Sequence, residues 1–126
     1  MANKIRLGFV GANVRSTWAS QSHYPALAAS PDVEMTAVCT TRAETAEAAR
    51  KAFGAKLAFT DFRTMVASKE IDAVAVVVRV PLHYEPTRAA IVALRKASTA
   101  AETAPSFPVC VLAMVGILGC ITIDLP

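Results

Sequence analysis

The sequence contains few cysteines, and they do not form a recognisable metal site. The three are Cys39, Cys110 and Cys120, with no Cys-x-x-Cys pair and no Cys/His spacing of the kind that binds zinc. The N-terminus also lacks the apolar stretch of a secretory signal. We therefore expect a cytoplasmic protein in a reducing environment, without a bound metal.

A clustered basic stripe is absent as well. The 13 Lys and Arg residues and the 10 Asp and Glu residues are scattered along the chain and leave a net charge of +3. A protein that follows a nucleic-acid backbone concentrates its positive charge on one face. We therefore expect no nucleic-acid partner.

Apolar runs alternate with helical patterns along this chain of 126 residues, which is long enough for one domain with a core. Such alternation predicts a parallel sheet with right-handed crossovers, whose ligands bind beyond the carboxyl ends of the strands. The expected fold is therefore α/β. Strands are predicted over 5–10, 33–39, 56–59 and 71–78, helices over 18–29, 43–53, 61–68 and 85–96, a helix C-cap at Gly54, a helix N-cap at Asp61, and crevice loops over 11–18, 40–42 and 79–84.

Glycine is scarce where a dinucleotide-binding turn requires it. The stretch GFVGANVRSTW, residues 8–18, runs from the end of the first predicted strand into the loop after it, where a dinucleotide-binding protein has its GxGxxG turn. Only Gly11 is retained, with Asn13 at the second glycine position and Ser16 at the third. Spacing alone leaves two interpretations open, a phosphate-binding loop and an ordinary strand-to-helix turn.

Three longer stretches carry a family resemblance: KIRLGFVGANVRSTWASQSHYPAL, EMTAVCTTRAETAEAA and IDAVAVVVRVPLHYE. They cover residues 4–94 and resemble the N-terminal domain of the Gfo/Idh/MocA oxidoreductases, in a branch that includes a transcriptional repressor. The resemblance implies a Rossmann-type three-layer α/β/α domain with a parallel sheet, incomplete relative to the full family domain. It also implies a nicotinamide dinucleotide as cofactor. The parent class transfers hydride between that cofactor and a sugar or polyol carbon.

The resemblance also implies roles for residues in two of the loops. The first loop holds the cofactor's pyrophosphate, and the loop after the fourth strand runs beneath the nicotinamide ribose and ring. For His83 a structural role as a cap or packing histidine stays open. The implied residues are the backbone of Gly11, Ala12 and Asn13 with the packing residue Trp18 in the first loop, and Val80, Pro81 and His83 in the last.

The end of the second predicted strand bears on which nicotinamide cofactor binds. NAD-preferring proteins usually place a carboxylate there for the ribose hydroxyls, whereas this chain has Thr40, Thr41 and Arg42. Hydroxyls and a guanidinium suit a 2′-phosphate, so NADP(H) is favoured over NAD(H). The alternative is that Arg42 is a solvated residue at a helix start.

The family resemblance ends before residues 97–126, an apolar tail that we separate from a Rossmann-type domain over 1–96. The tail lacks the family's catalytic lysine segment and substrate domain. Truncation of the gene product by a frameshift or retained intron is the favoured explanation. Addition of one or two strands beside the fourth strand, with a turn at Gly116 and Gly119, is the second. A membrane anchor is ranked third, because 107–123 would span only about 25 Å as a helix, which is shorter than the roughly 30 Å hydrocarbon core of a bilayer.

These observations predict a nucleotide-binding domain with residual or absent NADP(H) binding that does not catalyse hydride transfer alone. The alternative is a non-catalytic, nucleotide-sensing regulatory or protein-interaction module. In either case the tail is a candidate surface for a protein partner or for self-association, because unpaired apolar strands are exposed when their covering elements are missing.

Overall fold

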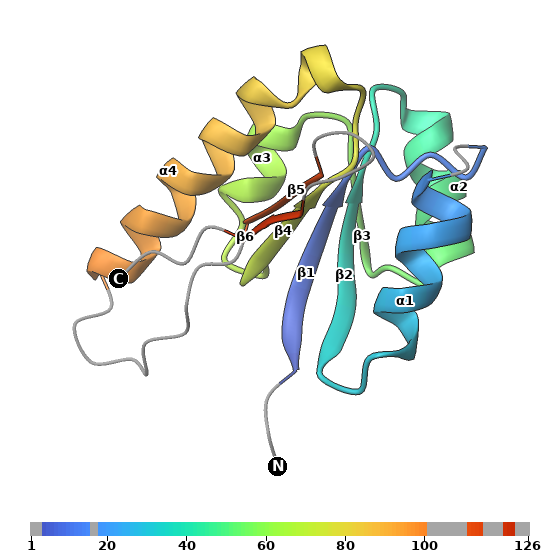
Figure 1. Ribbon diagram of the computed structural model, residues 1–126, viewed down its shortest axis with the longest axis horizontal. Helices are drawn as coiled ribbons and strands as arrows, with labels where there is room; N and C mark the ends of the chain where they lie inside the picture. Colours follow the sequence, from blue (N-terminus) through green and yellow to red (C-terminus); the bar gives the residue numbers. More distant parts are fainter. Residues whose placement is uncertain (1–3, 16–17, 101–110, 115–119, 123–126) are drawn as a thin grey trace.

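In a computed structural model of this protein, the strands among the described residues form one sheet in the order β3-β2-β1-β4-β5-β6 (Figure 1). The structure describes residues 4–15, 18–100, 111–114 and 120–122. Strands β1 to β5 are parallel to their neighbours, and β6 is antiparallel to β5. The strands are β1 Ile5–Val10, β2 Val33–Cys39, β3 Leu57–Phe59, β4 Ala73–Val76, β5 Val111–Met114 and β6 Cys120–Thr122.

Helices cover both faces of the sheet, so the predicted three-layer α/β/α arrangement is confirmed. Figure 1 shows α1 and α2 on one side and α3 and α4 on the other. The helical elements are the π-helix Trp18–His23, α1 Tyr24–Ala29, α2 Ala43–Phe53, α3 Phe62–Val66, the 3-10 helix Val80–Leu82 and α4 Tyr84–Ala100.

Alternation of side chains along the strands supplies a core on each face. Phe9 and Val38 are buried with Ala49 and Phe53 of α2. Side chains that alternate with these point to the other face of the sheet. Among them, Val10, Val74 and Val76 are buried with Met65 of α3 and Ala90 of α4. β4, with the sequence AVAV, is buried along its whole length, and the second halves of β1 and β2 are buried as well, as central parallel strands usually are.

Two helix boundaries confirm predictions from single residues. Asp61 is the N-cap of α3, and its Oδ1 accepts a hydrogen bond of 2.9 Å from the Arg63 N–H. Gly54 follows α2 with a left-handed φ of 65°, and its N–H donates to the carbonyl of Arg50. Both residues perform the capping roles that their types favour.

The first predicted helix, 18–29, is divided in the structure. A π-helix over Trp18–His23 precedes α1, in which Pro25 occupies the first turn. Proline lacks an N–H and its ring clashes with the carbonyl four residues earlier, so a continuous α-helix is not compatible with Pro25 at this point. The prediction of one helix here was wrong in this respect.

Part of the tail joins the sheet. β5 pairs with β4 in parallel, with Val111 opposite Val74, and β6 pairs with β5. Val111–Met114 thus occupies the place beside the fourth strand that the second explanation of the tail gives to an added strand. The predicted turn at Gly116 and Gly119 lies outside the described residues. Within the described residues, no helix has the length and apolar character needed to cross a membrane.

Candidate functional site

The carboxyl ends of β1, β2 and β4 meet at one edge of the sheet, where the strand order reverses. β2 lies on one side of β1 and β4 on the other, so the crossovers from β1 and from β3 leave in opposite directions. Two backbone hydrogen bonds join the loops there. The Gly11 N–H donates to the Cys39 carbonyl at 2.9 Å, and the Val77 N–H donates to the Val10 carbonyl at 2.8 Å. This switch point is where ligands of open α/β sheets bind.

Gly11 is required at this point for two reasons. Its φ is +82°, a conformation that residues with side chains rarely adopt. A β-carbon at this position would also lie 2.0 Å from the carbonyl oxygen of Val77. The retained glycine of the first loop therefore allows β1 and the end of β4 to approach closely.

The next two residues of the first loop use their backbone N–H groups inside the protein. The Ala12 N–H donates to Cys39 at 3.4 Å, and the Asn13 N–H donates to Gly11 at 2.7 Å. The Asn13 side chain accepts from the Arg15 N–H at 2.9 Å. Ala12 is buried, and Asn13 and Arg15 are exposed. Trp18 begins the π-helix, and its side chain lies outside the described part of the chain.

The loop after β2 is held by hydroxyl groups. Thr40 Oγ1 lies 2.9 Å from the Arg42 carbonyl oxygen, and Thr45 Oγ1, from α2, lies 3.0 Å from the same oxygen, both within hydrogen-bond distance. The two hydroxyl oxygens are 2.7 Å apart. Thr41 and Arg42 are exposed, and among the described residues Arg42 has no ion-pair partner. Of the three residues predicted here, Thr40 therefore positions the loop, while Thr41 and Arg42 face solvent.

The loop after β4 contains the 3-10 helix Val80–Leu82, in which Pro81 is exposed and the Val80 side chain is outside the description. His83 is only 7% exposed, and its Nε2 lies 2.6 Å from the Val78 carbonyl oxygen. An Nε2–H that donates to this carbonyl leaves Nδ1 as an acceptor. Nδ1 is buried and has no partner within the described residues. The structural interpretation of His83, as a residue that holds the loop, is the one that this geometry favours.

Cys39, at the end of β2, is not a nucleophile in this environment. The thiol is buried, and burial together with the nearby Asp61 carboxylate raises its pKa to about 11. The thiol is therefore protonated at neutral pH and unreactive.

His23 is partly buried, which lowers its pKa. The described residues contain no group of three or more His, Cys, Asp or Glu that could hold a metal ion.

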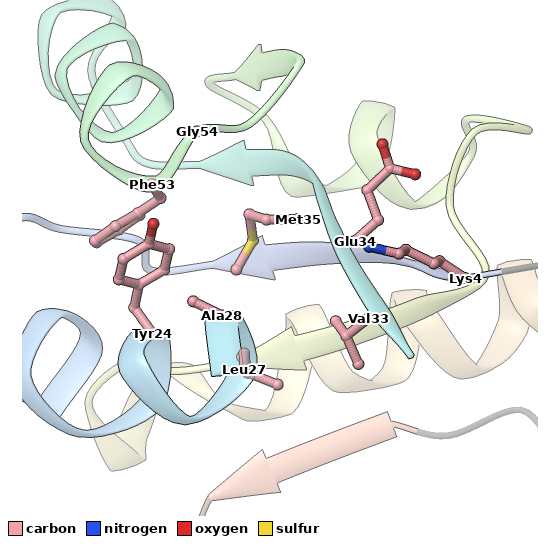
Figure 2. Close-up of a pocket in the computed structure, with 9 residues that line it drawn as sticks. All are labelled: Lys4, Tyr24, Leu27, Ala28, Val33, Glu34, Met35, Phe53 and Gly54. Carbon is pink, nitrogen blue, oxygen red and sulfur yellow. The ribbon is translucent and has the colours of Figure 1, made fainter. Parts of the chain in front are cut away.

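A separate pocket of about 260 Å³ lies away from the switch point, between α1, the start of β2 and the end of α2 (Figure 2). Tyr24 and Phe53 stack on one side of it with ring centroids 4.5 Å apart, and Lys4 and Glu34 lie at its other end. It is thus close to the amino ends of β1 and β2. None of the predicted site residues lines it.

Two residues near the switch point were not identified from the sequence. Arg15 is a cation within the first loop, and a basic residue two positions after Asn13 is the signal that would have indicated it. Thr45 is three positions beyond Arg42 in the first turn of α2, where a threonine hydroxyl commonly reaches a backbone carbonyl.

Comparisons with known proteins agree with this geometry. Residues 5–96 match the sequence profile of the Gfo/Idh/MocA group, described as an oxidoreductase family with an NAD-binding Rossmann fold. The galactose/lactose metabolism regulatory protein GAL80 of Saccharomyces cerevisiae is 36% identical over 87 residues, which cover 67% of this chain and 20% of that protein. The chain thus spans a fifth of the length of this curated relative.

Solved structures show the same similarity. The 3-ketoreductase KijD10 from Actinomadura kijaniata, in complex with NADP, is 27% identical with a TM-score of 0.70, covering 88% of this chain and 30% of that one. A super-repressor mutant of Gal80p from Saccharomyces cerevisiae is 31% identical with a TM-score of 0.63, covering 73% of this chain and 24% of that one. With its switch-point glycine, its parallel sheet and a profile match over most of its length, the chain belongs to the Gfo/Idh/MocA oxidoreductase family and has that family's NAD-binding Rossmann fold.

Proposed function

We propose that this chain binds NADP(H) in preference to NAD(H), in the crevice at the carboxyl ends of β1, β2 and β4. The observation that carries the preference is the loop 40–42, which contains no carboxylate and presents an exposed Arg42 guanidinium. An adenosine ribose bearing a 2′-phosphate gains charge-assisted hydrogen bonds from that group. The structure of KijD10 in complex with NADP supports the same choice of cofactor.

The first loop fits the pyrophosphate in a modified way. Gly11 lets the first loop pass close to the Val77 backbone, where a β-carbon would lie 2.0 Å from the Val77 carbonyl oxygen, and so keeps the turn tight at the place where the pyrophosphate is proposed to bind. Because the N–H groups of Gly11, Ala12 and Asn13 donate within the protein, we propose that they shape the loop rather than bind phosphate. The exposed Arg15 then supplies positive charge to the pyrophosphate.

At the nicotinamide end, Val80 and Pro81 form the surface beneath the ribose and ring in this proposal. Pro81 fixes φ, so the backbone of the 3-10 helix has little freedom there. The hydrogen bond between His83 Nε2 and the Val78 carbonyl joins the two ends of that segment. The bound cofactor supplies the hydride chemistry, and these residues bind and orient it.

We further propose that the chain by itself binds nucleotide without turnover. The described parts of the three loops, 11–15, 40–42 and 77–84, contain no lysine and no carboxylate. The His83 imidazole is buried and its Nε2 is already hydrogen-bonded, so it is not placed to exchange a proton with a substrate. The family's acid/base would have to come from residues outside these loops.

The similarity to GAL80, a regulatory protein, favours one alternative, a nucleotide-sensing module that associates with protein. Light scattering of the purified chain with and without NADPH separates the two proposals. A change in oligomeric state on addition of NADPH supports the sensing module, and an unchanged state supports a simple binding domain.

Titration of the purified 126-residue chain with NADPH and, separately, with NADH tests the principal proposal. Nicotinamide fluorescence reports binding, and the melting temperature reports stabilisation, because a ligand that binds only the folded state must stabilise it. Saturable binding with a lower Kd for NADPH supports the proposal. A folded sample that binds neither nucleotide would overturn it.

A further inference from the structure

Thr45 lies outside the loop that follows β2, yet its side chain contacts that loop directly. The Arg42 carbonyl oxygen accepts from the Ala46 N–H at 2.9 Å and lies 2.9 Å from the Thr40 hydroxyl oxygen and 3.0 Å from the Thr45 hydroxyl oxygen. The two hydroxyl oxygens are 2.7 Å apart, and because each carries one proton, one hydroxyl donates to the other, which in turn donates to the carbonyl. The backbone of Arg42 is therefore held from both sides.

The two anchors of this network are themselves fixed in the fold. Thr45 belongs to α2, which is packed on the sheet through its buried Ala46, Ala49 and Phe53. Thr40 follows β2, and its N–H donates to the Phe59 carbonyl at the end of β3 at 3.2 Å. The hydroxyl network thus ties Arg42 to both a helix and a strand.

The Arg42 side chain, by contrast, is not restrained by the protein. It is exposed, it makes no cap hydrogen bond to α2, and it has no ion-pair partner among the described residues. The backbone of Arg42 is extended, with φ −129° and ψ 141°. Fixing the backbone fixes the direction in which the side chain leaves the loop, and such preorganisation lowers the cost of ordering a long side chain on a ligand.

We infer that Thr45 is a positioning residue for recognition of a 2′-phosphate: its hydroxyl holds the Arg42 backbone so that the guanidinium faces the adenosine ribose. The inference rests on the proposed function, because it assumes that Arg42 binds this phosphate. It adds a specificity determinant in α2, outside the loop that carries the charge.

The test compares Thr45→Val, which removes the hydroxyl at nearly constant shape, with Thr45→Ser, which retains it. Adenosine 2′,5′-bisphosphate and 5′-AMP are the probes, because they differ by the 2′-phosphate and lack the nicotinamide and pyrophosphate. The readout is the ratio of the two dissociation constants measured by calorimetry. Partial unfolding of a variant lowers its apparent affinity for both ligands by the same factor. The ratio of the two dissociation constants therefore reports positioning and not stability.

Loss of one hydrogen bond that orders the loop is expected to lower the preference for the bisphosphate about fivefold in Thr45→Val. Thr45→Ser should keep the wild-type ratio. Thr64→Val, which removes an exposed hydroxyl on α3, is the matched control and should also keep it.

Three results would contradict the inference, and they are distinguishable. If the wild type prefers the bisphosphate and Thr45→Val has the same ratio of dissociation constants, the positioning role of Thr45 is overturned, while the proposed 2′-phosphate site still stands. An equal loss in Thr45→Ser and Thr45→Val shows that the hydroxyl is not the cause. A wild-type chain that binds the two probes equally removes the 2′-phosphate site itself, and the proposed preference for NADP(H) fails with it.

Discussion

Gly11 and Val77, the residues that directly follow β1 and β4, approach each other closely: a β-carbon on residue 11 would lie 2.0 Å from the Val77 carbonyl oxygen. The contact occurs where the strand order reverses, and the Val77 N–H donates to the neighbouring Val10 carbonyl at 2.8 Å. The geometry of the crevice therefore depends on the absence of a side chain at a single position.

Gly11→Ala should destabilise the fold by about 3 kcal/mol or more, because it combines a positive φ with a backbone clash. Urea denaturation measures the change. Gly54→Ala is the matched control, since Gly54 has a φ of 65° but nothing within 4 Å of an added β-carbon. It should cost only about 1 kcal/mol. Equal destabilisation by the two substitutions would show that the contact with Val77 is not limiting.

Arg42→Ala should raise the Kd for NADPH about 10- to 100-fold, the value of a charge-assisted hydrogen bond. The Kd for NADH should change less than about twofold, because NADH carries no 2′-phosphate. Fluorescence titration of both nucleotides measures the difference, with Arg88→Ala on the exposed side of α4 as the control. An equal rise in the Kd for NADPH and for NADH would mean that Arg42 contacts a group that the two nucleotides share.

The elements that sequence predicted best are those set by local chemistry. Asp61 and Gly54 cap helices for reasons contained in their own residue types, and the apolar run that contains β4 requires burial on both faces. The interruption of the first helix was predictable in principle from Pro25, but the strong apolar pattern around it outweighed that signal.

Other features depend on partners far away in the chain and were not predictable. The Gly11 and Ala12 N–H groups both donate to the Cys39 carbonyl, 28 and 27 positions away, so their use inside the protein appears only when the sheet is assembled. Likewise, the burial of His83 against the Val78 carbonyl depends on how the 3-10 helix turns back. A motif reports the residue types of a loop but not which of their hydrogen bonds are already made.

The Cys39 thiol should lower stability at alkaline pH. Its folded pKa, about 11, lies above the ordinary value of 9.0 that applies to the unfolded chain. The unfolded state therefore loses this proton first, and the contribution to stability, fully present below about pH 9, is lost as pH rises toward 11. Other groups titrate in this range, so the measurement is the difference between wild type and Cys39→Ala in urea midpoints from pH 8 to pH 10.5. A constant difference would contradict the raised pKa.

The same thiol should react slowly with iodoacetamide at pH 7, because only the thiolate is nucleophilic. Peptide mass spectrometry separates its alkylation from that of Cys110 and Cys120. The unfolded chain in urea is the reference, and Cys39 should react there at the rate of an ordinary thiol. Rapid alkylation of Cys39 in the folded chain would contradict the protected environment.

Arg6 and Asp72 tie the start of β1 to the start of β4. Two side-chain hydrogen bonds, 2.9 and 2.7 Å long, join the guanidinium to the carboxylate, which also accepts from the Arg6 backbone N–H at 3.0 Å. The Arg6 hydrogen bonds lower the pKa of Asp72. The stabilisation is therefore present above the ordinary Asp pKa of about 4 and is lost as pH falls through the lower folded value.

Asp72→Asn should consequently cost about 1 kcal/mol at pH 7, the upper range for a partly exposed ion pair. It should also make the urea midpoint less sensitive to acid between pH 5 and pH 2. Asp32→Asn is the control, because the Asp32 side chain is exposed and takes part in no described ion pair. An acid sensitivity equal to that of the wild type would show that Asp72 is not the group responsible.

The location of the cofactor is tested most directly by amide chemical-shift mapping of the ¹⁵N-labelled chain at saturating NADP⁺. The largest changes are expected at residues 13–15, 40–42 and 79–84, the three loops at the switch point. Changes centred on Tyr24, Glu34 and Phe53 would instead place the nucleotide in the pocket at the other end of the sheet. That result, or a folded spectrum that NADP⁺ leaves unchanged, would contradict a cofactor site at the carboxyl ends of β1, β2 and β4.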